Sequence, residues 1–214
     1  MNFNGVRVCG VPDNVGTKVC KWPISDLTVY AAGKLGEVDV LEAVRFATDA
    51  WSKVCGINFV FVSNPKTAHL VVTQSAIDGP FGTLGVAELP CGFSSGAIVN
   101  FARNFDSAEI WALSLNPPRG RIDAGRVFRH EFGHLLGIPH LMEGNLMQAT
   151  YSDDIIDLQR GDELEALSRY PITKPRPDTP PPAPPPMSGP FRSLIVTDEA
   201  GQQWRGGVDK WERL

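Results

Sequence analysis

Residues 130–140 read His-Glu-Phe-Gly-His-Leu-Leu-Gly-Ile-Pro-His, and this stretch decides the fold and the chemistry expected of the chain. His130 and His134 are four residues apart, so on a helix they lie on one face, about one turn apart, and can reach a single metal ion. With His140 they supply three imidazole ligands for a catalytic zinc and leave the fourth tetrahedral position open for water. Glu131 stands beside them to take the proton of that water.

The helix that carries these side chains must end before His140 can turn back to the metal. Gly137 accepts a positive φ and Pro139 cannot continue a helix, so together they predict a sharp turn. The alternative is an ordinary core helix with two hydrogen-bonded histidines. Three of the 4 histidines fall in this one run, which favours the metal site.

The run resembles that of the metzincin zinc endopeptidases, and within them most closely that of the matrixins, the matrix metalloproteinase family. Met147, in the segment Asn145–Tyr151, is similar to the family's Met-turn, a hydrophobic floor beneath the zinc. Tyr151 corresponds to the tyrosine of the substrate pocket wall, and Ala149 stands where the family has proline. The resemblance covers roughly residues 5–170.

The fold that this resemblance implies is an α/β zincin domain with a twisted five-stranded mixed sheet, an active-site helix, a Met-turn and a C-terminal helix. Apolar residues recur at helical spacing from Val40 to Val54 and stop before Gly56, which predicts the first long helix. The active-site helix is expected to begin near Asp123. Strands of a mostly parallel sheet with one antiparallel edge are expected at residues 57–62, 69–73, 82–89 and 96–101.

By the same resemblance, a substrate peptide would lie along the edge strand at residues 84–88 and pair with it through main-chain hydrogen bonds. Arg126, on the active-site helix, is expected to shorten the side-chain pocket. The substrate-binding residues implied are Leu84, Gly85, Val86, Ala87, Val127, Ala149 and Tyr151.

Three acidic residues are similar to the carboxylates that hold a structural calcium in matrixins. Asp78 lies in an Asp-Gly-Pro-Phe-Gly loop, and Asp106 and Glu109 lie in a Phe-Asp segment that precedes a tryptophan. Hard oxygen ligands of this kind suit calcium. The alternative is a solvated turn with surface acids.

The family's second, structural zinc is not expected here. Val86 and Asn104 occupy two of its histidine positions, and His69 falls outside that pattern. We therefore expect His69 to be an ordinary hydrogen-bonded histidine.

The segment Cys9–Asp13 resembles the cysteine switch that keeps matrixin zymogens silent. A thiolate bound to zinc would take the position of the water that Glu131 needs. Arg7 lies two residues before Cys9 rather than next to it, and only eight residues precede Cys9, so the family's helical prodomain is not expected. The alternative is a free cysteine in a loose terminus.

The other cysteines are Cys20, Cys55 and Cys91. One disulfide among them and three buried thiols in a reducing compartment remain equally open. The resemblance implies an extracellular protein, yet residues 1–8 have no apolar run, so a signal peptide is not expected in this sequence.

The net charge of -4 and the lack of a basic stripe exclude nucleic acid as an expected partner. No stretch is long and apolar enough to predict a membrane span. We expect an inhibitory segment at residues 1–20 and a catalytic domain at residues 21–170.

Residues 171–190 are half proline and predict a stiff polyproline spacer, or a ligand for an aromatic-lined groove of a docking partner. Residues 191–214 alternate apolar and polar side chains around turn signals, which predicts a small hairpin. A disordered tail and a hairpin docked on an assembly are the alternatives.

Taken together, the sequence predicts a metalloendopeptidase in which Glu131 is the general base and Cys9 on zinc maintains latency. The alternative from another class is a catalytically silent zinc-binding module, structural or adhesive, within a larger assembly. A third hypothesis, a decoy that offers its N-terminus to other matrixins, has only the switch segment in its favour.

Overall fold

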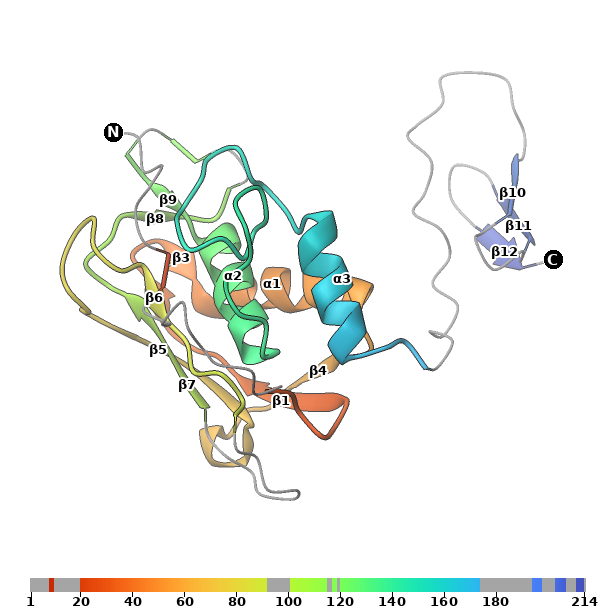
Figure 1. Cartoon of the computed structure of the whole chain (residues 1–214), viewed down its shortest axis with the longest axis horizontal. Coiled ribbons are helices and arrows are strands. Elements are labelled where there is room, and N and C mark those ends of the chain that lie inside the picture. Colours follow the sequence, from red (N-terminus) through yellow and green to blue (C-terminus); the bar gives the residue numbers. More distant parts are fainter. Residues whose placement is uncertain are drawn as a thin grey trace. The chain divides into compact units, whose positions relative to one another are not determined.

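A five-stranded mixed sheet forms the frame of the domain in this computed structural model, with the strand order β4-β1-β5-β7-β6 (Figure 1). β1 pairs in parallel with β4 and β5, β5 pairs in parallel with β7, and β6 runs antiparallel to β7 at the edge. The expected mostly parallel sheet with one antiparallel edge strand is confirmed. The strands are β1 (Asp26–Tyr30), β4 (Asn58–Phe61), β5 (Leu70–Ser75), β6 (Gly85–Val86) and β7 (Phe101–Asp106).

The structure describes residues 8–9, 20–91, 101–114, 117–118 and 120–173, together with the backbone of three strands near the C-terminus. The first long helix, α1 (Val40–Val54), has the expected bounds, and the side chain of Asp39 caps it by accepting a hydrogen bond from the Glu42 amide at 3.1 Å. Its buried residues recur every three or four positions, so one stripe faces the core.

The second helix, α2 (Ala124–Leu135), is buried along its whole length and lies beside α1 against the sheet (Figure 1). Asp123 caps it by accepting from the Gly125 amide at 2.9 Å. The indole of Trp51 on α1 donates to the carbonyl of Arg129 at 2.8 Å. Phe128 stacks on Phe105 of β7 at 3.6 Å between ring centroids, which fixes α2 to the sheet.

The chain after α2 returns to the core through α3 (Arg160–Arg169). The hydroxyl of Tyr170 donates to the carbonyl of Leu136 at 2.9 Å and accepts from the Trp22 amide at 3.0 Å. The Trp22 indole donates to the carbonyl of Leu135 at 2.7 Å. Residues near the beginning and near the end of the domain thus both form hydrogen bonds with the C-terminal end of α2.

The smaller elements line the periphery. A hairpin pairs β2 (Lys34–Leu35) with β3 (Val38–Asp39), and a parallel pair joins β8 (Trp111–Ala112) to β9 (Ile122–Asp123). A short 3-10 helix, η1, covers Pro65–Thr67.

Two expected strands have the wrong bounds. The edge strand expected over residues 82–89 is ordered as a strand only at Gly85–Val86, because the loop before it turns its amides to carboxylates instead of to β7. The strand expected over residues 96–101 begins at Phe101 and runs to Asp106; residues 96–100 lie outside the described part. Polar residues such as Asn104 interrupt the apolar pattern by which a strand is predicted, although β5 pairs with this strand over its full length.

The structure decides between the two cysteine alternatives. Cys20 and Cys91 form a disulfide that spans 71 residues of sequence, with their Cα atoms 4.5 Å apart. Cys55 is a buried cysteine outside this disulfide, and its thiol donates to the carbonyl of Trp51 at 3.3 Å. The bond ties the start of the domain to the segment that follows the edge strand.

The chain divides into two compact units, Met1–Thr173 and Lys174–Leu214. In the second unit, β10 (Leu194–Thr197), β11 (Gln203–Gly206) and β12 (Trp211–Arg213) form an antiparallel three-stranded sheet, one strand more than the expected hairpin. The proline run lies outside the described residues. Within the described part, none of the helices has both the length and the apolar character that crossing a bilayer requires.

Candidate metal centre

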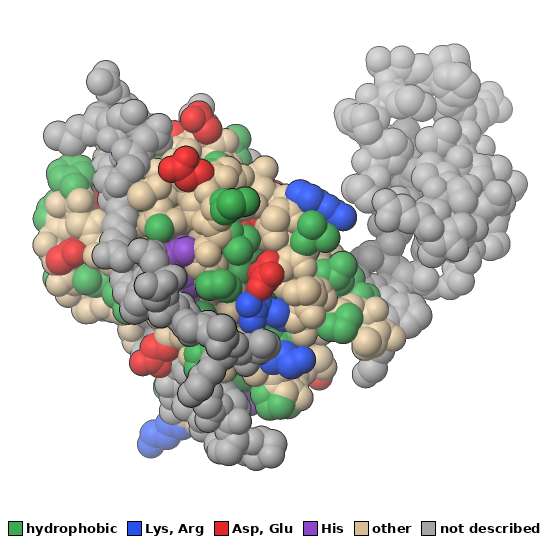
Figure 2. All heavy atoms as spheres, viewed as in Figure 1, with side chains coloured by type: hydrophobic (Ala, Val, Ile, Leu, Met, Phe, Trp, Pro, Cys, Tyr) green, Lys and Arg blue, Asp and Glu red, His purple; other side chains and the backbone are tan. Residues whose placement is uncertain are grey.

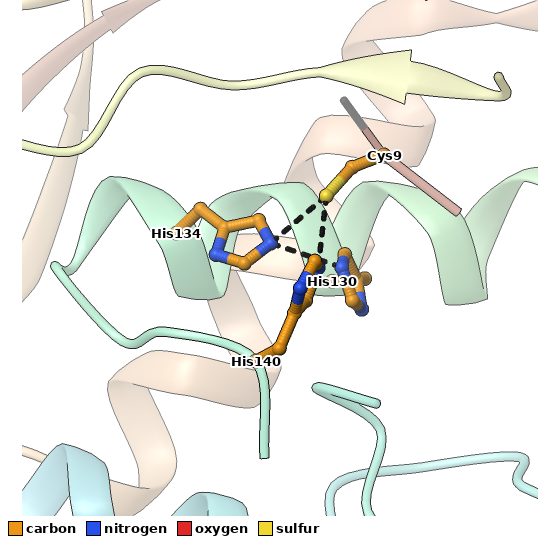
Figure 3. A group of neighbouring side chains, drawn as sticks. All are labelled: Cys9, His130, His134 and His140. Atoms are coloured by element: carbon orange, nitrogen blue, oxygen red, sulfur yellow. Dashed lines mark hydrogen bonds between the residues drawn. The ribbon is translucent and has the colours of Figure 1, made fainter. Parts of the chain in front are cut away.

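Four side chains from three separate segments converge on one point at the face of α2 (Figure 3). The ligand atoms of Cys9, His130, His134 and His140 all lie within 4.8 Å of one another. The sulfur of Cys9 is 3.1 Å from Nε2 of His134 and 3.1 Å from Nε2 of His140, and Nε2 of His130 is 3.0 Å from Nε2 of His134. Among the described residues, this is the only such group of potential metal ligands.

Backbone carbonyls fix the orientation of the two helix histidines. Nδ1 of His130 lies 2.8 Å from the carbonyl oxygen of Leu146, and Nδ1 of His134 lies 2.8 Å from that of Ile138. A donated Nδ1 proton leaves Nε2 as the ligand atom, which is the tautomer that a metal requires. Burial lowers the pKa of His130 to about 3, so its ring is neutral and available as a ligand.

This donor set fits zinc. Three imidazole nitrogens and one thiol sulfur suit a tetrahedral zinc site, whereas magnesium and calcium require oxygen ligands. The helix histidines and Cys9 are almost fully shielded from solvent. His140 is half-buried, and histidine side chains are visible in purple on the face shown in Figure 2.

The turn that brings His140 to the other ligands depends on Gly137. Its φ is +79°, and an added Cβ would collide with the carbonyl oxygen of Cys20. The amide of Gly137 donates to the carbonyl of His134 at 2.8 Å and closes the end of the helix. The expectation that the helix ends here is therefore confirmed, and the structure adds a close backbone approach as a second reason for glycine.

The carboxylate of Glu131 lies against the edge strand. Glu131 is fully buried, and a Cβ built on Gly85 of β6 would lie 3.0 Å from the Glu131 carboxyl carbon. The side chain therefore stands between α2 and β6, next to the converging histidines. A side chain at position 85 would press tightly against Glu131 and force its carboxylate to shift.

Met147 packs against α2, the helix that carries His130 and His134, and its role as the floor of a Met-turn stays a prediction. It is fully buried, and a Cβ on Gly133 of α2 would collide with its sulfur and with the ring of Trp51. The carbonyl of Met147 accepts from the amide of Leu141 at 2.9 Å. This packing leaves no gap between the Met-turn and the helix that carries the ligands.

Asp162 anchors this turn and was missed by the sequence reasoning. Its buried carboxylate, on α3, accepts from the amides of Leu146 at 2.8 Å, Met147 at 3.0 Å and Gln159 at 2.7 Å. Burial raises the pKa of Asp162, and the three donated hydrogen bonds oppose that shift. An acidic residue in the first turn of a helix is ordinary, so only its burial distinguishes it.

A small cavity lies beside His130, between α2 and the segment after the Met-turn. Its volume is about 20 Å³, which is room for roughly one water molecule. The expected pocket residues Val127 and Tyr151 line it, together with Arg126 and with Thr150 and Ile155, which the sequence did not single out. Burial raises the pKa of Tyr151 to about 12, so its hydroxyl is un-ionised at neutral pH.

The other residues expected to bind substrate are divided between core and edge. Leu84 is fully buried, and its carbonyl accepts from the Asp106 amide at 3.0 Å. Val86 is half-exposed on β6, and Ala87 is buried against Cys9. Ala149 does not line the cavity.

The segment that carries Cys9 lies along the edge strand. Cys9 and Gly85 form a parallel bridge, and the Gly85 amide donates to the carbonyl of Val8 at 2.9 Å. The Val8 amide in turn donates to the carbonyl of Ala149 at 3.1 Å, and its side chain lines the small cavity. The segment therefore occupies the surfaces where a substrate peptide was expected.

The three residues expected to bind calcium lie around one loop but are engaged by backbone amides. Asp78 accepts from the Thr83 amide at 2.8 Å, Asp106 accepts from the Ala108 amide at 2.8 Å, and Glu109 accepts from the Phe81 amide. Burial raises the pKa of Glu109, and the charges of the two aspartates add to the shift. Calcium binding here stays a prediction.

His69 is hydrogen-bonded, in keeping with its expected structural role. Its Nδ1 accepts from the Thr28 amide at 3.0 Å and lies 2.8 Å from the Thr28 hydroxyl. Burial lowers its pKa.

Comparison with known proteins agrees with this geometry. The chain is 31% identical to matrix metalloproteinase-20 of Homo sapiens over 67% of this chain and 31% of that protein. It is 28% identical to neutrophil collagenase of Homo sapiens over 84% of this chain and 42% of that protein, and 30% identical to interstitial collagenase of Bos taurus over 70% and 37%. The chain spans less than half the length of these relatives. The model of the matrixin family of peptidases matches residues 18–170, and the chain therefore belongs to the matrixin family.

Proposed function

We propose that this protein is a zinc-dependent endopeptidase that is held latent by its own Cys9. The observation that carries the proposal is the convergence of three imidazole nitrogens and one thiol within 4.8 Å, with the Glu131 carboxylate beside them. Matrixins use a catalytic zinc, and the three histidines fit that ion. When bound, zinc supplies a Lewis acid that polarises the scissile carbonyl and acidifies water.

Glu131 is the general base in this proposal. Its carboxylate takes a proton from the attacking water and later passes that proton to the leaving amine. The position of Glu131 under Gly85 supports this role, since a peptide paired with β6 would run directly over the carboxylate. The Glu131 carboxylate is fully shielded from solvent while the Cys9 segment is in place.

Latency follows from the place of Cys9. A thiolate on zinc fills the coordination position that water needs, and zinc binding favours the deprotonated sulfur. The backbone of Val8 and Cys9 also covers β6 and the Ala149 carbonyl, so a substrate cannot pair there. Cleavage of the chain between Asp13 and Lys21 would release the segment, provided that the cut lies before Cys20, which the disulfide holds to Cys91.

The substrate is a protein or peptide chain. The names of the relatives include two collagenases, which brings collagen-derived peptides into the substrate panel. Calcium on Asp78, Asp106 and Glu109 is proposed as a structural ion, and a docking partner for the proline-rich segment is proposed without further support. Acidic and basic side chains both appear on the face shown in Figure 2.

The test compares the zinc-loaded full chain with its Cys9→Ala and Glu131→Ala variants on one peptide library. We expect Cys9→Ala to cleave at once, the parent to cleave only after its N-terminal segment is lost, and Glu131→Ala to keep zinc but lose about a thousandfold or more in kcat. Elemental analysis and cleavage-site profiling measure these outcomes. A zinc-loaded Cys9→Ala protein that cleaves nothing would favour the silent binding module instead.

A further inference from the structure

Two arginines of α2 hold the loop that forms one wall of the small cavity. We call residues 152–158 the wall loop; they contain no helix or strand. Arg126 donates to the carbonyl of Ser152 at 3.0 Å at the start of the loop and lies 3.7 Å from the carboxylate of Asp153. Arg129 pairs with Asp157 at its end. Both ends of the loop are thus fastened to the helix that carries His130.

The pair at the end of the loop is unusual because one partner is buried and the other is not. The Arg129 side chain is 1% exposed and lies 4.3 Å over the ring of Phe46, whereas the Asp157 side chain is 69% exposed. Burial lowers the pKa of Arg129, and the charges of Asp157 and Asp123 oppose that shift. A buried guanidinium deprived of its carboxylate would keep the cost of burial without the compensating partner.

The wall loop shapes the cavity between these two anchors. Ile155 lies near the middle of the loop and lines the cavity together with Val127 and His130. The cavity has a volume of only about 20 Å³, so a small displacement of Ile155 would change which side chains it can admit. Arg126 itself lines the cavity, whereas Arg129 does not line it and contacts the loop through Asp157.

We propose that the Arg129–Asp157 pair sets side-chain specificity: it holds the wall loop against α2 and so limits the size of the residue that the cavity accepts. This inference rests on the proposed peptidase function. Arg129 and Asp157 touch no reacting atom, so both are positioning residues.

The test uses the zinc-loaded full chain with Cys9→Ala as the parent and adds Asp157→Asn. Peptides that differ only in the residue after the scissile bond, from alanine through leucine to tryptophan, give a ratio of kcat/KM for bulky over small residues. We expect Asp157→Asn to raise this ratio by about fivefold or more, mainly through a lower KM for bulky peptides. Hydrogen exchange of the amides at residues 152–158 should quicken.

Two variants serve as controls. Asp154→Asn removes the same charge from an exposed position in the same loop and should leave the ratio and the exchange rates at the parent's values. Asp157→Glu keeps the carboxylate and should restore most of the parent's selectivity. Equal shifts in Asp154→Asn and Asp157→Asn, or no shift in an active Asp157→Asn protein, would overturn the positioning role alone. An inactive parent would overturn the peptidase function and this role with it.

Discussion

At the scale of single residues, Asp162 shows how a group outside the zinc site can govern it. Its carboxylate fixes the amides of Leu146 and Met147, and the carbonyl of Leu146 fixes His130. Outer contacts of this kind commonly change metal affinity about tenfold to a hundredfold when they are lost. The path from α3 to His130 therefore consists of two consecutive hydrogen bonds.

We expect Asp162→Asn to lower the free energy of unfolding by about 1–3 kcal/mol, because an amide cannot accept all three backbone hydrogen bonds. Zinc affinity should fall with it. Urea unfolding and competition with a chromogenic chelator measure the two effects. Glu163→Gln, on the same turn, is the control, since its exposed pair with Arg160 contributes little. Equal behaviour of the two variants would contradict the anchoring role.

His130 predicts how the metal-free protein responds to pH. The unfolded chain takes up a proton near the ordinary pKa of 6.5, whereas burial holds the folded pKa at about 3. At pH values between these two pKa values, protonation therefore stabilises the unfolded chain relative to the folded one. The contribution of the neutral His130 ring to the free energy of unfolding is complete above pH 6.5 and is lost as the pH falls toward 3. Urea unfolding in the presence of a chelator at several pH values should show this slope. The slope should be smaller in His130→Gln. Parallel curves of stability against pH for the two proteins would mean that His130 is not the group responsible.

At the scale of elements, the end of α2 depends on one glycine for two separate reasons. Gly137 needs a positive φ, and it also faces the carbonyl of Cys20 at a distance that no side chain tolerates. Gly144 has a φ of +89° but nothing within 4 Å of an added Cβ. A comparison of substitutions at the two glycines therefore distinguishes the cost of a positive φ from the cost of a steric collision.

We expect Gly137→Ala to destabilise the protein clearly more than Gly144→Ala, which should cost about 1–2 kcal/mol for the positive φ alone. Gly137→Ala should also weaken zinc binding, because the turn that presents His140 is displaced. Thermal melting with and without zinc tests both effects. A similar cost for the two substitutions would mean that the Cys20 contact has no energetic weight.

The sequence predicted the elements that have strong periodicity and missed those that do not. The spacing of apolar residues gave α1 its bounds, and Asp123 marked the start of α2. β7 was misplaced because its second half is polar and gains its stability from pairing with β5, a contact remote in sequence. Hydrogen bonds between distant segments, such as those of Asp162, leave no local pattern at all.

The candidate site was predictable for a related reason. Three of its four converging ligands stand in one helix and the turn after it, so their spacing alone places them together. Cys9 could be placed only through a resemblance, since 121 residues separate it from His130, as 130 − 9 = 121. The burial of Arg129 and its pair with the exposed Asp157 could not be read from the chain, because a charged residue on a helix is usually solvated.

At the scale of the whole molecule, the disulfide between Cys20 and Cys91 closes a loop of 71 residues that contains α1 and most of the sheet. In the chain-entropy model, a loop of this length stabilises the folded state by about 4 kcal/mol. We expect Cys20→Ser with Cys91→Ser to lower the free energy of unfolding by an amount of that order. Guanidinium unfolding measures it, with Cys55→Ala as a cysteine control outside the bond, and an unchanged midpoint would contradict it.

That disulfide also determines what a cut upstream of it would do. Cys20 is held by Cys91 and by a 3.3 Å hydrogen bond from Arg169, and Cys9 stands eleven residues earlier, as 20 − 9 = 11. A covalent tether of this length keeps the thiol of Cys9 at an effective concentration in the millimolar range. Once the chain between Cys9 and Cys20 is cleaved, the freed peptide is diluted to the concentration of the protein itself. Rebinding then becomes an ordinary second-order encounter, whose rate falls as the protein is diluted.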